Sequence, residues 1–335
     1  MRLWLTALVA LCLAGGAAAQ DPAAFYKGRT VELYVGYSPG GGYDLYGRTV
    51  ARFMGRHLPG GPTIVVKNMP GAGSLRLANW LYNVAPKDGA AFGIVGRGVP
   101  MEPVLGGQGA QFDGRRFTWI GSANDEVSTC VAAKESGIGR FEDLKTRQLI
   151  VGGTGSGADT DVFPAVLNHV FGTKMKIVSG YPGGSEVALA MERGEVGGRC
   201  GWSWSTIKAN SLHLVRDGRI RLLVQFGLSK HADLPDVPLV MDLAENDEQR
   251  QVLRVIFARQ VMGRPFLAPP GVPAERAAAL RAAFMATMKD PEFLAVAEKA
   301  QLEITPVAGE AVAALMEEVY ATPPAIAEKA AAAVR

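Results

Sequence analysis

The sequence predicts an α/β fold made of two similar domains, and three observations lead to this prediction. The chain has 335 residues, of which 48% are apolar, so it is long enough to bury two cores. An apolar run, a glycine-rich loop and an amphipathic helix follow one another over residues 31–58. The same order returns over residues 148–171. Because strand–loop–helix–strand units imply parallel pairing, each half is expected to hold an open sheet covered by helices.

The first 19 residues are expected to be a signal peptide. Arg2 precedes an apolar run from Leu3 to Leu13, and three alanines ending at Ala19 supply a cleavage site. Cys12 could instead carry a lipid anchor, but the bulky Leu11 before it disfavours this alternative. We therefore expect an exported protein, cleaved after Ala19 and located in the periplasm.

Export leaves two cysteines, Cys130 and Cys200. An oxidising compartment permits a disulfide between them, and two buried free thiols are the alternative. The formal net charge is +3, and charges of both signs are mixed along the chain without a basic block. This distribution is not typical of nucleic-acid-binding proteins.

The elements of the first domain follow in order from the apolar pattern. Ser74 is placed to cap the second helix, and Arg97 lies just past the carboxyl end of the third strand. The expected strands are 31–35, 63–67 and 92–95, and the expected helices are 43–58 and 75–84.

The order of strand, glycine-rich loop and helix then returns over residues 148–171, which indicates a second domain. The chain is expected to return to the first domain after residue 227. The predicted domains are 20–122 plus 228–335, and 123–227. Segments 117–122 and 128–133 are expected to form a strand pair around a polar break. Further expected strands are 148–151, 175–178, 196–200, 220–226 and 261–267, and further helices are 161–171, 185–191, 274–288, 291–301 and 309–330.

The sequence contains one pattern that resembles a catalytic motif. The run from Gly36 to Gly40 matches the G-x-S-x-G pattern of serine hydrolases, with Ser38 as the nucleophile. That site needs the N–H of the next residue, which is Pro39 and has none. No P-loop or dinucleotide-binding spacing is present. Because the four histidines are also scattered, we expect no metal, no cofactor and no enzyme activity.

The remaining pattern favours binding of an anion. Glycine loops at the start of helices present free N–H groups, which suit a carboxylate. Arg97 and Arg199 are either binding cations or solvated surface residues, and at most one of Trp202 and Trp204 is expected to line a pocket. Asp44 is either a helix N-terminal acid or a direct ligand contact.

Three ordered motifs resemble the periplasmic substrate-binding proteins of tripartite tricarboxylate transporters, the Bug receptor group. They are Tyr37–Asp44, Val66–Gly73 and Ala85–Gly89. Segments 152–160, 181–184 and 234–238 also match in order, so that the resemblance runs from about residue 25 to the C-terminus.

The resemblance implies a two-domain periplasmic-binding-protein fold of type II, a Venus flytrap with two crossover segments. Its ligand would be a small organic carboxylate, and a dicarboxylate or aromatic acid is favoured because residues 197–202 lack the acid that would suit an amino group. The partner would be a membrane permease, and the receptor itself a soluble monomer. A module that signals to a sensor kinase is the alternative.

The resemblance also implies which residues bind the ligand. One carboxylate would be met by both glycine-rich loops, and the far end of the ligand by residues around Arg199. The expected ligand-binding residues are Tyr37, Ser38, Gly41, Gly42, Tyr43, Asp44, Arg97, Thr154, Gly155, Ser156, Thr160, Tyr181, Arg199 and Trp202.

Overall fold

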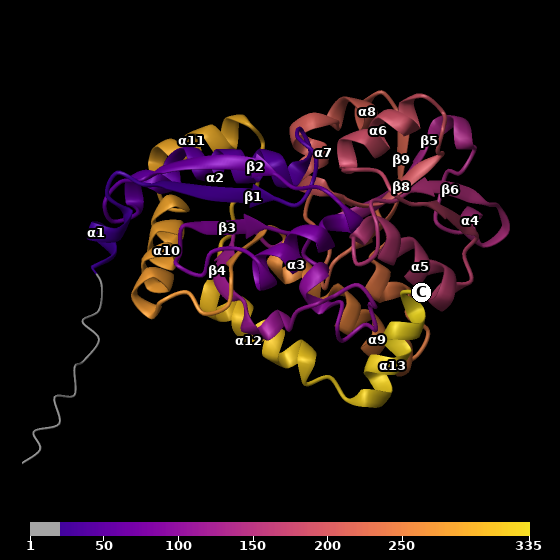
Figure 1. Cartoon of the computed structure of the whole chain (residues 1–335). Helices are drawn as coiled ribbons and strands as arrows, with labels where there is room; N and C mark the ends of the chain where they lie inside the picture. The colour runs from indigo at the N-terminus through magenta and orange to yellow at the C-terminus, as the bar shows by residue number, and fades with distance from the viewer. Residues whose placement is uncertain (1–20) are drawn as a thin grey trace, which may run out of the picture.

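A computed structural model describes residues 21–335 and shows two lobes, each built around a β-sheet (Figure 1). The predicted signal peptide and its cleavage site lie outside the described residues. Within residues 21–335, no helix is both long and apolar enough to cross a membrane.

The first sheet has the strand order β11-β4-β10-β3-β1-β2. Strand β1 pairs in parallel with β2 and β3, whereas β10 runs antiparallel between β3 and β4. The strands are β1 (Thr30–Val35), β2 (Thr63–Asn68), β3 (Ala91–Ile94), β4 (Thr118–Ser122), β10 (Pro265–Ala268) and β11 (Val307–Ala308).

The second sheet has the order β7-β6-β8-β5-β9, and its antiparallel strand β5 lies between β8 and β9. Its strands are β5 (Ser128–Ala133), β6 (Leu149–Gly152), β7 (Met175–Val178), β8 (Gly198–Ser203) and β9 (Ile220–Phe226). In each sheet one antiparallel strand arrives from the other sheet, β5 after β4 and β10 after β9, and the first sheet has a second antiparallel strand, β11, at its edge. The prediction of two similar α/β units is confirmed.

The expected pairing of segments 117–122 and 128–133 is wrong. They form β4 and β5, which belong to different sheets. The polar break between them, residues 123–127, is the first passage of the chain from one sheet to the other. A local pattern of two short apolar runs cannot distinguish a hairpin from such a crossover, because both place a polar link between two strands.

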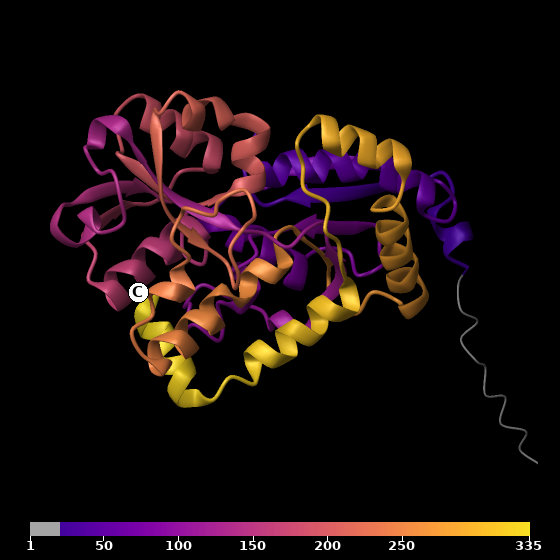
Figure 2. The ribbon, with the colours of Figure 1, turned by 180° about the vertical axis from the view of Figure 1, so that it is seen from behind.

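Helices cover both sheets, and the C-terminal segment runs from the first lobe to the second (Figure 2). The helices are α1 (Pro22–Tyr26), α2 (Gly42–His57), α3 (Leu75–Asn83), α4 (Asp143–Thr146), α5 (Asp159–Phe171), α6 (Gly184–Glu192), α7 (Trp204–Asn210), α8 (Leu212–Arg216), α9 (Asp247–Phe257), α10 (Ala274–Thr287), α11 (Pro291–Lys299), α12 (Gly309–Tyr320) and α13 (Pro324–Ala333). The domain boundary at residue 228 stays a prediction, since α9 and α13 pack on each other and α13 also contacts α5.

Two local expectations differ from the structure. The single helix expected over 309–330 is two helices, because Pro323 and Pro324 interrupt the backbone hydrogen bonding. Ser74 does not cap α3 with its side chain. Its backbone has a φ of +86°, and its hydroxyl accepts a hydrogen bond from the Gly96 N–H at 3.0 Å. Ser74 therefore joins the second glycine turn to the end of β3.

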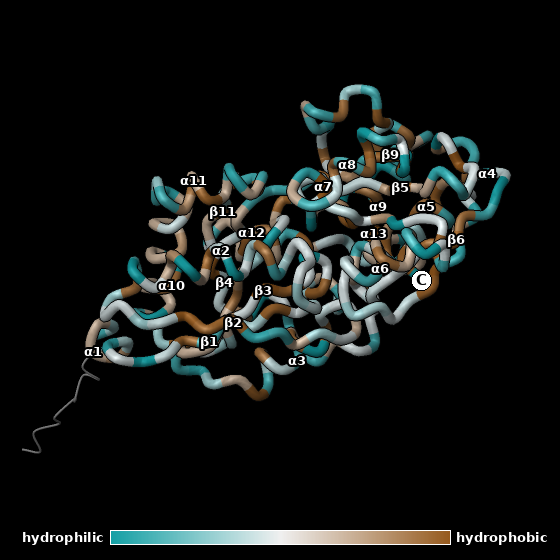
Figure 3. The backbone as a smooth tube through the Cα atoms, turned by 90° about the horizontal axis from the view of Figure 1, so that it is seen from above, coloured by the Kyte–Doolittle hydropathy of each residue, from teal (hydrophilic) through white to brown (hydrophobic). Residues whose placement is uncertain are grey.

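The spacing of apolar residues in the strands explains which faces of the sheets are buried. In β1, Val31, Leu33 and Val35 are fully buried and alternate with partly exposed residues. Strand β5 is buried at every position because helices or loops cover both of its faces. Figure 3 shows the strands as apolar segments inside each lobe, with hydrophilic segments towards the outside.

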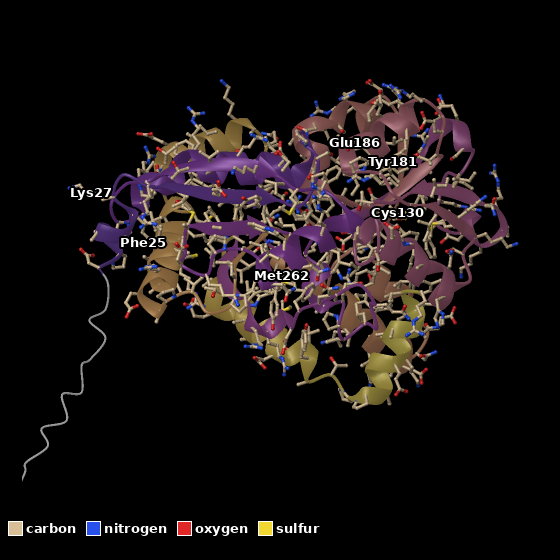
Figure 4. All side chains as sticks on the ribbon, in the orientation of Figure 1. Phe25, Lys27, Cys130, Tyr181, Glu186 and Met262 are labelled. Atoms are coloured by element: carbon tan, nitrogen blue, oxygen red, sulfur yellow. A yellow bond between two sulfur atoms is a disulfide. The ribbon has the colours of Figure 1, made fainter. Side chains whose placement is uncertain are left out.

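Cys130 and Cys200 form a disulfide that links β5 to the neighbouring strand β8. Both cysteines are fully buried. Figure 4 places Cys130 within the second lobe. The bond closes a loop with a sequence separation of 70, so it restricts the unfolded chain considerably.

We expect the double variant Cys130→Ala/Cys200→Ala to lower the free energy of unfolding by about 2–4 kcal/mol, because the unfolded chain gains entropy. Urea unfolding of the two proteins measures this difference. A reductant should destabilise the wild-type protein and leave the double variant unchanged; equal stability of oxidised and reduced wild-type protein would contradict the prediction.

Candidate functional site

A cleft between the two lobes contains a partly open space, which we call the inner cavity. Its walls come from the loop after β1, the end of β3, the loop between β6 and α5, and strand β8. The space not filled by atoms is about 550 Å³, including the part that opens to solvent. Both sheets therefore contribute to the cavity, at the carboxyl ends of their parallel strands, where open α/β sheets bind ligands.

The first glycine loop is held in shape by Asp44. The Gly40 N–H donates to Asp44 Oδ2 at 2.9 Å, Asn68 Nδ2 donates to Oδ1 at 2.8 Å, and Arg48 Nε lies 2.9 Å away. Burial raises the pKa of the Asp44 carboxyl, but the hydrogen bonds from Arg48, Asn68 and Gly40 outweigh it and leave this pKa below its ordinary value. Asp44 thus stabilises the loop, and it does not line the inner cavity.

Two tyrosines form one wall of the inner cavity. The rings of Tyr37 and Tyr43 are stacked with their centroids 4.8 Å apart. The Tyr37 hydroxyl donates to the Gly73 carbonyl at 3.0 Å, and the Tyr43 hydroxyl accepts from the Arg97 N–H at 3.1 Å. The first glycine loop, the second glycine turn and the end of β3 are thereby joined.

The loop between β6 and α5 approaches the first domain through its backbone. The Gly73 N–H donates to the Thr154 carbonyl at 2.8 Å. The Thr154 and Gly155 N–H groups donate to Asp161 Oδ2 at 2.8 and 2.9 Å. Gly155 has a φ of +131°, and a Cβ there would lie 2.6 Å from Gly73 N. This loop can therefore approach the first lobe only with glycine at residue 155. The carboxylate of Asp161 already accepts hydrogen bonds from two of the loop's N–H groups.

Buried arginines form the floor of the cleft. Arg97 is only 1% exposed, and its Nε lies 2.5 Å from Asp159 Oδ2. Its Nη2 donates to the hydroxyls of Ser128 and Ser203 at 2.8 and 3.0 Å. Arg259 Nη1 lies 3.4 Å from the other oxygen of Asp159. Each of these guanidinium groups therefore has a carboxylate partner, as buried charges require.

Arg264 is also paired. Its Nη1 lies 3.3 Å from Glu126 Oε2, and its Nη2 donates to Thr206 Oγ1 at 3.0 Å. The guanidinium also lies over the ring of Tyr43, 4.9 Å from its centroid. Arg264 therefore joins the wall of the first glycine loop to α7 of the second lobe.

Arg199 differs from these arginines, because no carboxylate of the described residues forms an ion pair with it. Its Nη1 donates to the Gly184 carbonyl at 2.9 Å, and its guanidinium lies 4.6 Å from the ring centroid of Trp202. Its Nε is buried without a hydrogen-bond partner in the described part of the chain. Arg199 lies deep between the lobes, but part of its surface stays accessible and lines the cleft.

The charge of Arg199 is the main electrostatic feature of the cleft. Burial lowers the pKa of Arg199 to about 9, with a smaller contribution from Arg264. Tyr37 and Glu186 act in the opposite direction. The guanidinium therefore remains charged at neutral pH, without an acid of the described chain to neutralise it.

Eight of the predicted site residues lie together around the inner cavity. They are Tyr37, Gly41, Gly42, Tyr43, Arg97, Thr154, Thr160 and Arg199. A ninth, Trp202, lines a second hollow beside Arg199, whereas Trp204 donates its indole N–H to Asp233 at 3.0 Å.

The other five predicted residues do not line the inner cavity. Besides Asp44, Ser38 donates to Glu186 Oε2 at 2.7 Å across the two lobes, and Ser156 donates to Glu102 at 3.0 Å. Gly155 packs on Gly73, and the Tyr181 N–H donates to the Gly153 carbonyl at 3.1 Å. Figure 4 shows Tyr181 and Glu186 near each other in the second lobe.

Sequence reasoning missed several residues of the cavity. Asp159, Thr206 and Arg264 were not predicted, although all three line it. Asp159 is an acid at the start of a helix, which is a common position without function. No sequence signal shows that Arg264 comes near residues 159–206, because this proximity depends on the chain returning to the first sheet.

One group of side chains outside the cleft has the composition of a metal site. His231, Asp233 and Glu303 place potential ligand atoms within 4.8 Å of one another. Lys208 Nζ lies 2.9 Å from Asp233 Oδ2 and also contacts Glu303. The ammonium group of Lys208 therefore already supplies the positive charge among these acids.

Solved structures with the same fold cover nearly the whole chain. The periplasmic binding protein BugD has a TM-score of 0.72 at 21% identity, over 91% of this chain and 97% of that one. MatC from Rhodopseudomonas palustris, solved with bound malate, has 0.71 at 19% identity, over 90% and 99%. An R. palustris protein solved with adipate has 0.69 at 18% identity, over 90% and 97%.

Sequence comparisons point to the same group. No curated protein matches the chain. The sequence pattern of the tripartite tricarboxylate transporter family receptor matches residues 47–331, which is most of the chain. The resemblance inferred from the three motifs is confirmed, and the chain belongs to the tripartite tricarboxylate transporter receptor family.

Proposed function

We propose that this protein is an extracytoplasmic receptor that binds a small organic carboxylate in the inner cavity and delivers it to a membrane permease. The observation that carries this proposal is Arg199, a charged guanidinium without an acid partner in the described chain, at the wall of the cleft. A ligand carboxylate would supply the missing negative charge through charge-assisted hydrogen bonds.

A dicarboxylate fits the cavity better than a ligand with one charge. Arg97, Arg199 and Arg264 line the cavity together with one acid, Asp159. Glu126 pairs with Arg264, and Arg259 shares Asp159 with Arg97, so four guanidinium groups face two carboxylates and leave a positive excess of two charges. One carboxylate would therefore meet Arg199, and the second would accept a hydrogen bond from a hydroxyl such as that of Thr206, whose oxygen accepts from Arg264. The malate and adipate found in two related structures are dicarboxylates of this kind.

Binding without catalysis is supported by the position of Ser38. Its hydroxyl donates to Glu186 and does not line the inner cavity, whereas a nucleophile needs a base and access to the ligand. We also propose that the receptor acts as a monomer in the periplasm.

Native mass spectrometry of the purified protein tests the proposal directly. We expect a bound species whose mass corresponds to a small organic acid, which unlabelled dicarboxylates then displace. A panel of dicarboxylates, sugars and amino acids in a thermal-shift assay complements this experiment. Stabilisation by sugars, with none by any carboxylate, would show that the proposed function is wrong.

We expect Arg199→Gln to weaken binding of dicarboxylates by about 2–5 kcal/mol, at least about 30-fold, because the ligand would lose a cation that has no carboxylate partner within residues 21–335. Glutamine keeps the aliphatic stem of the side chain and removes its charge, so the fold should be unaffected. Isothermal titration calorimetry measures the affinity. Arg193→Gln, an exposed arginine of the same lobe, is the control, and equal affinities of both variants would contradict the role of Arg199.

We expect Gly42→Ala to impair closure of the cleft on its ligand. A Cβ on Gly42 would lie 2.2 Å from Thr206 Oγ1 of the other lobe, whereas one on Gly41 would meet only Ser185 Oγ at 3.9 Å. Overpacking of this kind costs about 1–3 kcal/mol, which corresponds to an affinity about 5- to 150-fold lower. Calorimetry and small-angle scattering with ligand should show weaker binding and less compaction than in the matched variant Gly41→Ala. Identical behaviour of the two variants would contradict the prediction.

A further inference from the structure

A second hollow adjoins the inner cavity, and we call it the outer groove. It contains about 570 Å³ of space not filled by atoms, including its open side. It runs from the first glycine loop along α6 to Ser211. The two spaces share Gly41, Gly42, Gly184, Arg199 and Thr206 in their walls. One molecule bound at Arg199 can therefore extend into both.

The two spaces differ in chemistry. The inner cavity has three arginines in its wall, whereas Arg199 is the only cation among the described residues that line the outer groove. Helix α6 contributes Ala188 and Leu189, and Leu189 is 44% exposed although it is apolar. Glu192, which is exposed, adds a negative charge to the groove wall. A second carboxylate is therefore disfavoured in the outer groove, and an uncharged group is favoured.

Trp202 adds a further apolar surface next to the charge. The Arg199 guanidinium lies over its ring. Its indole N–H is buried without a hydrogen-bond partner in the described residues. The stacking holds Arg199 at the junction of the two spaces. A carboxylate that meets Arg199 there would direct the rest of its molecule either inwards or along Leu189.

We propose that the outer groove is a subsite for the uncharged alkyl or aryl body of a carboxylic acid whose carboxylate binds Arg199. The inference rests on the proposed function and extends it, because it assigns to this receptor acids that are larger than the inner cavity encloses. Each methylene that leaves water for the groove should raise the affinity by up to about three- to four-fold. The increase ends when the chain reaches the open end of the groove near Ser211.

Calorimetry with a graded series of acids tests the inference. The probes are acetate, butyrate, hexanoate and phenylacetate, with succinate as a short dicarboxylate. We expect the affinity of the monocarboxylates to rise along the series and phenylacetate to bind at least as well as butyrate. Equal affinities of acetate, hexanoate and phenylacetate would overturn the inference.

Two variants locate the effect in the groove. Ala188→Phe fills it, and we expect it to weaken binding of hexanoate and phenylacetate at least about ten-fold while succinate changes less than about three-fold. Leu189→Ser removes an exposed apolar side chain and should not affect folding; it should weaken the same two acids about three- to ten-fold. Ala295→Phe, at an exposed residue of α11, is the matched control.

The outcomes separate this inference from the proposed function. If no carboxylate binds, the proposed function fails, and the inference fails with it. If succinate binds but chain length has no effect, only the inference about the outer groove is overturned. Equal losses for succinate and hexanoate in Leu189→Ser would also overturn it, because the groove would then not distinguish the body of the ligand from its charge.

Discussion

The carboxylate of Asp159 connects the two lobes at the floor of the cleft, and the site depends on this connection. One oxygen lies 2.5 Å from Nε of Arg97, just after β3, and the other lies 3.4 Å from Arg259, which precedes β10. Because all three side chains are buried, removal of the shared carboxylate would leave two uncompensated guanidinium groups in a medium of low polarity. Asp159 is also the first residue of α5, so this pairing positions the loop that precedes α5 against the first lobe.

Arg199 differs from the other arginines of the cleft in its charge pairing. Arg97, Arg259 and Arg264 each have a carboxylate partner and serve to join segments that are distant in the sequence. Arg199 is held by a carbonyl and an aromatic ring, neither of which neutralises it. A receptor that contains both kinds of arginine can keep its cleft in shape without a ligand and still offer an anion the guanidinium of Arg199. This division of roles supports a carboxylate as the ligand.

Contacts between the lobes at the mouth of the cleft are made largely by backbone and small side chains. The Gly73 N–H meets the Thr154 carbonyl at 2.8 Å, and the Ser38 hydroxyl meets Glu186 at 2.7 Å. Glycine at residues 42 and 155 leaves room for these approaches, since a Cβ at either would collide with the opposite lobe. The glycine loops thus have two roles, to line the cavity and to let the lobes meet around a ligand.

The sequence by itself determined the family, the two α/β units and most of their elements, because these depend on local periodicity and on motifs that are contiguous in the chain. It also identified Arg97 and Arg199 as candidates, but it could not say that Arg97 has a partner and that Arg199 has none. Only the tertiary structure decided this, since Asp159 and Arg97 are 62 residues apart and meet through the packing of two sheets. For the same reason Ser38, which looked like a ligand hydroxyl, contacts Glu186, and segments 117–122 and 128–133 belong to different sheets.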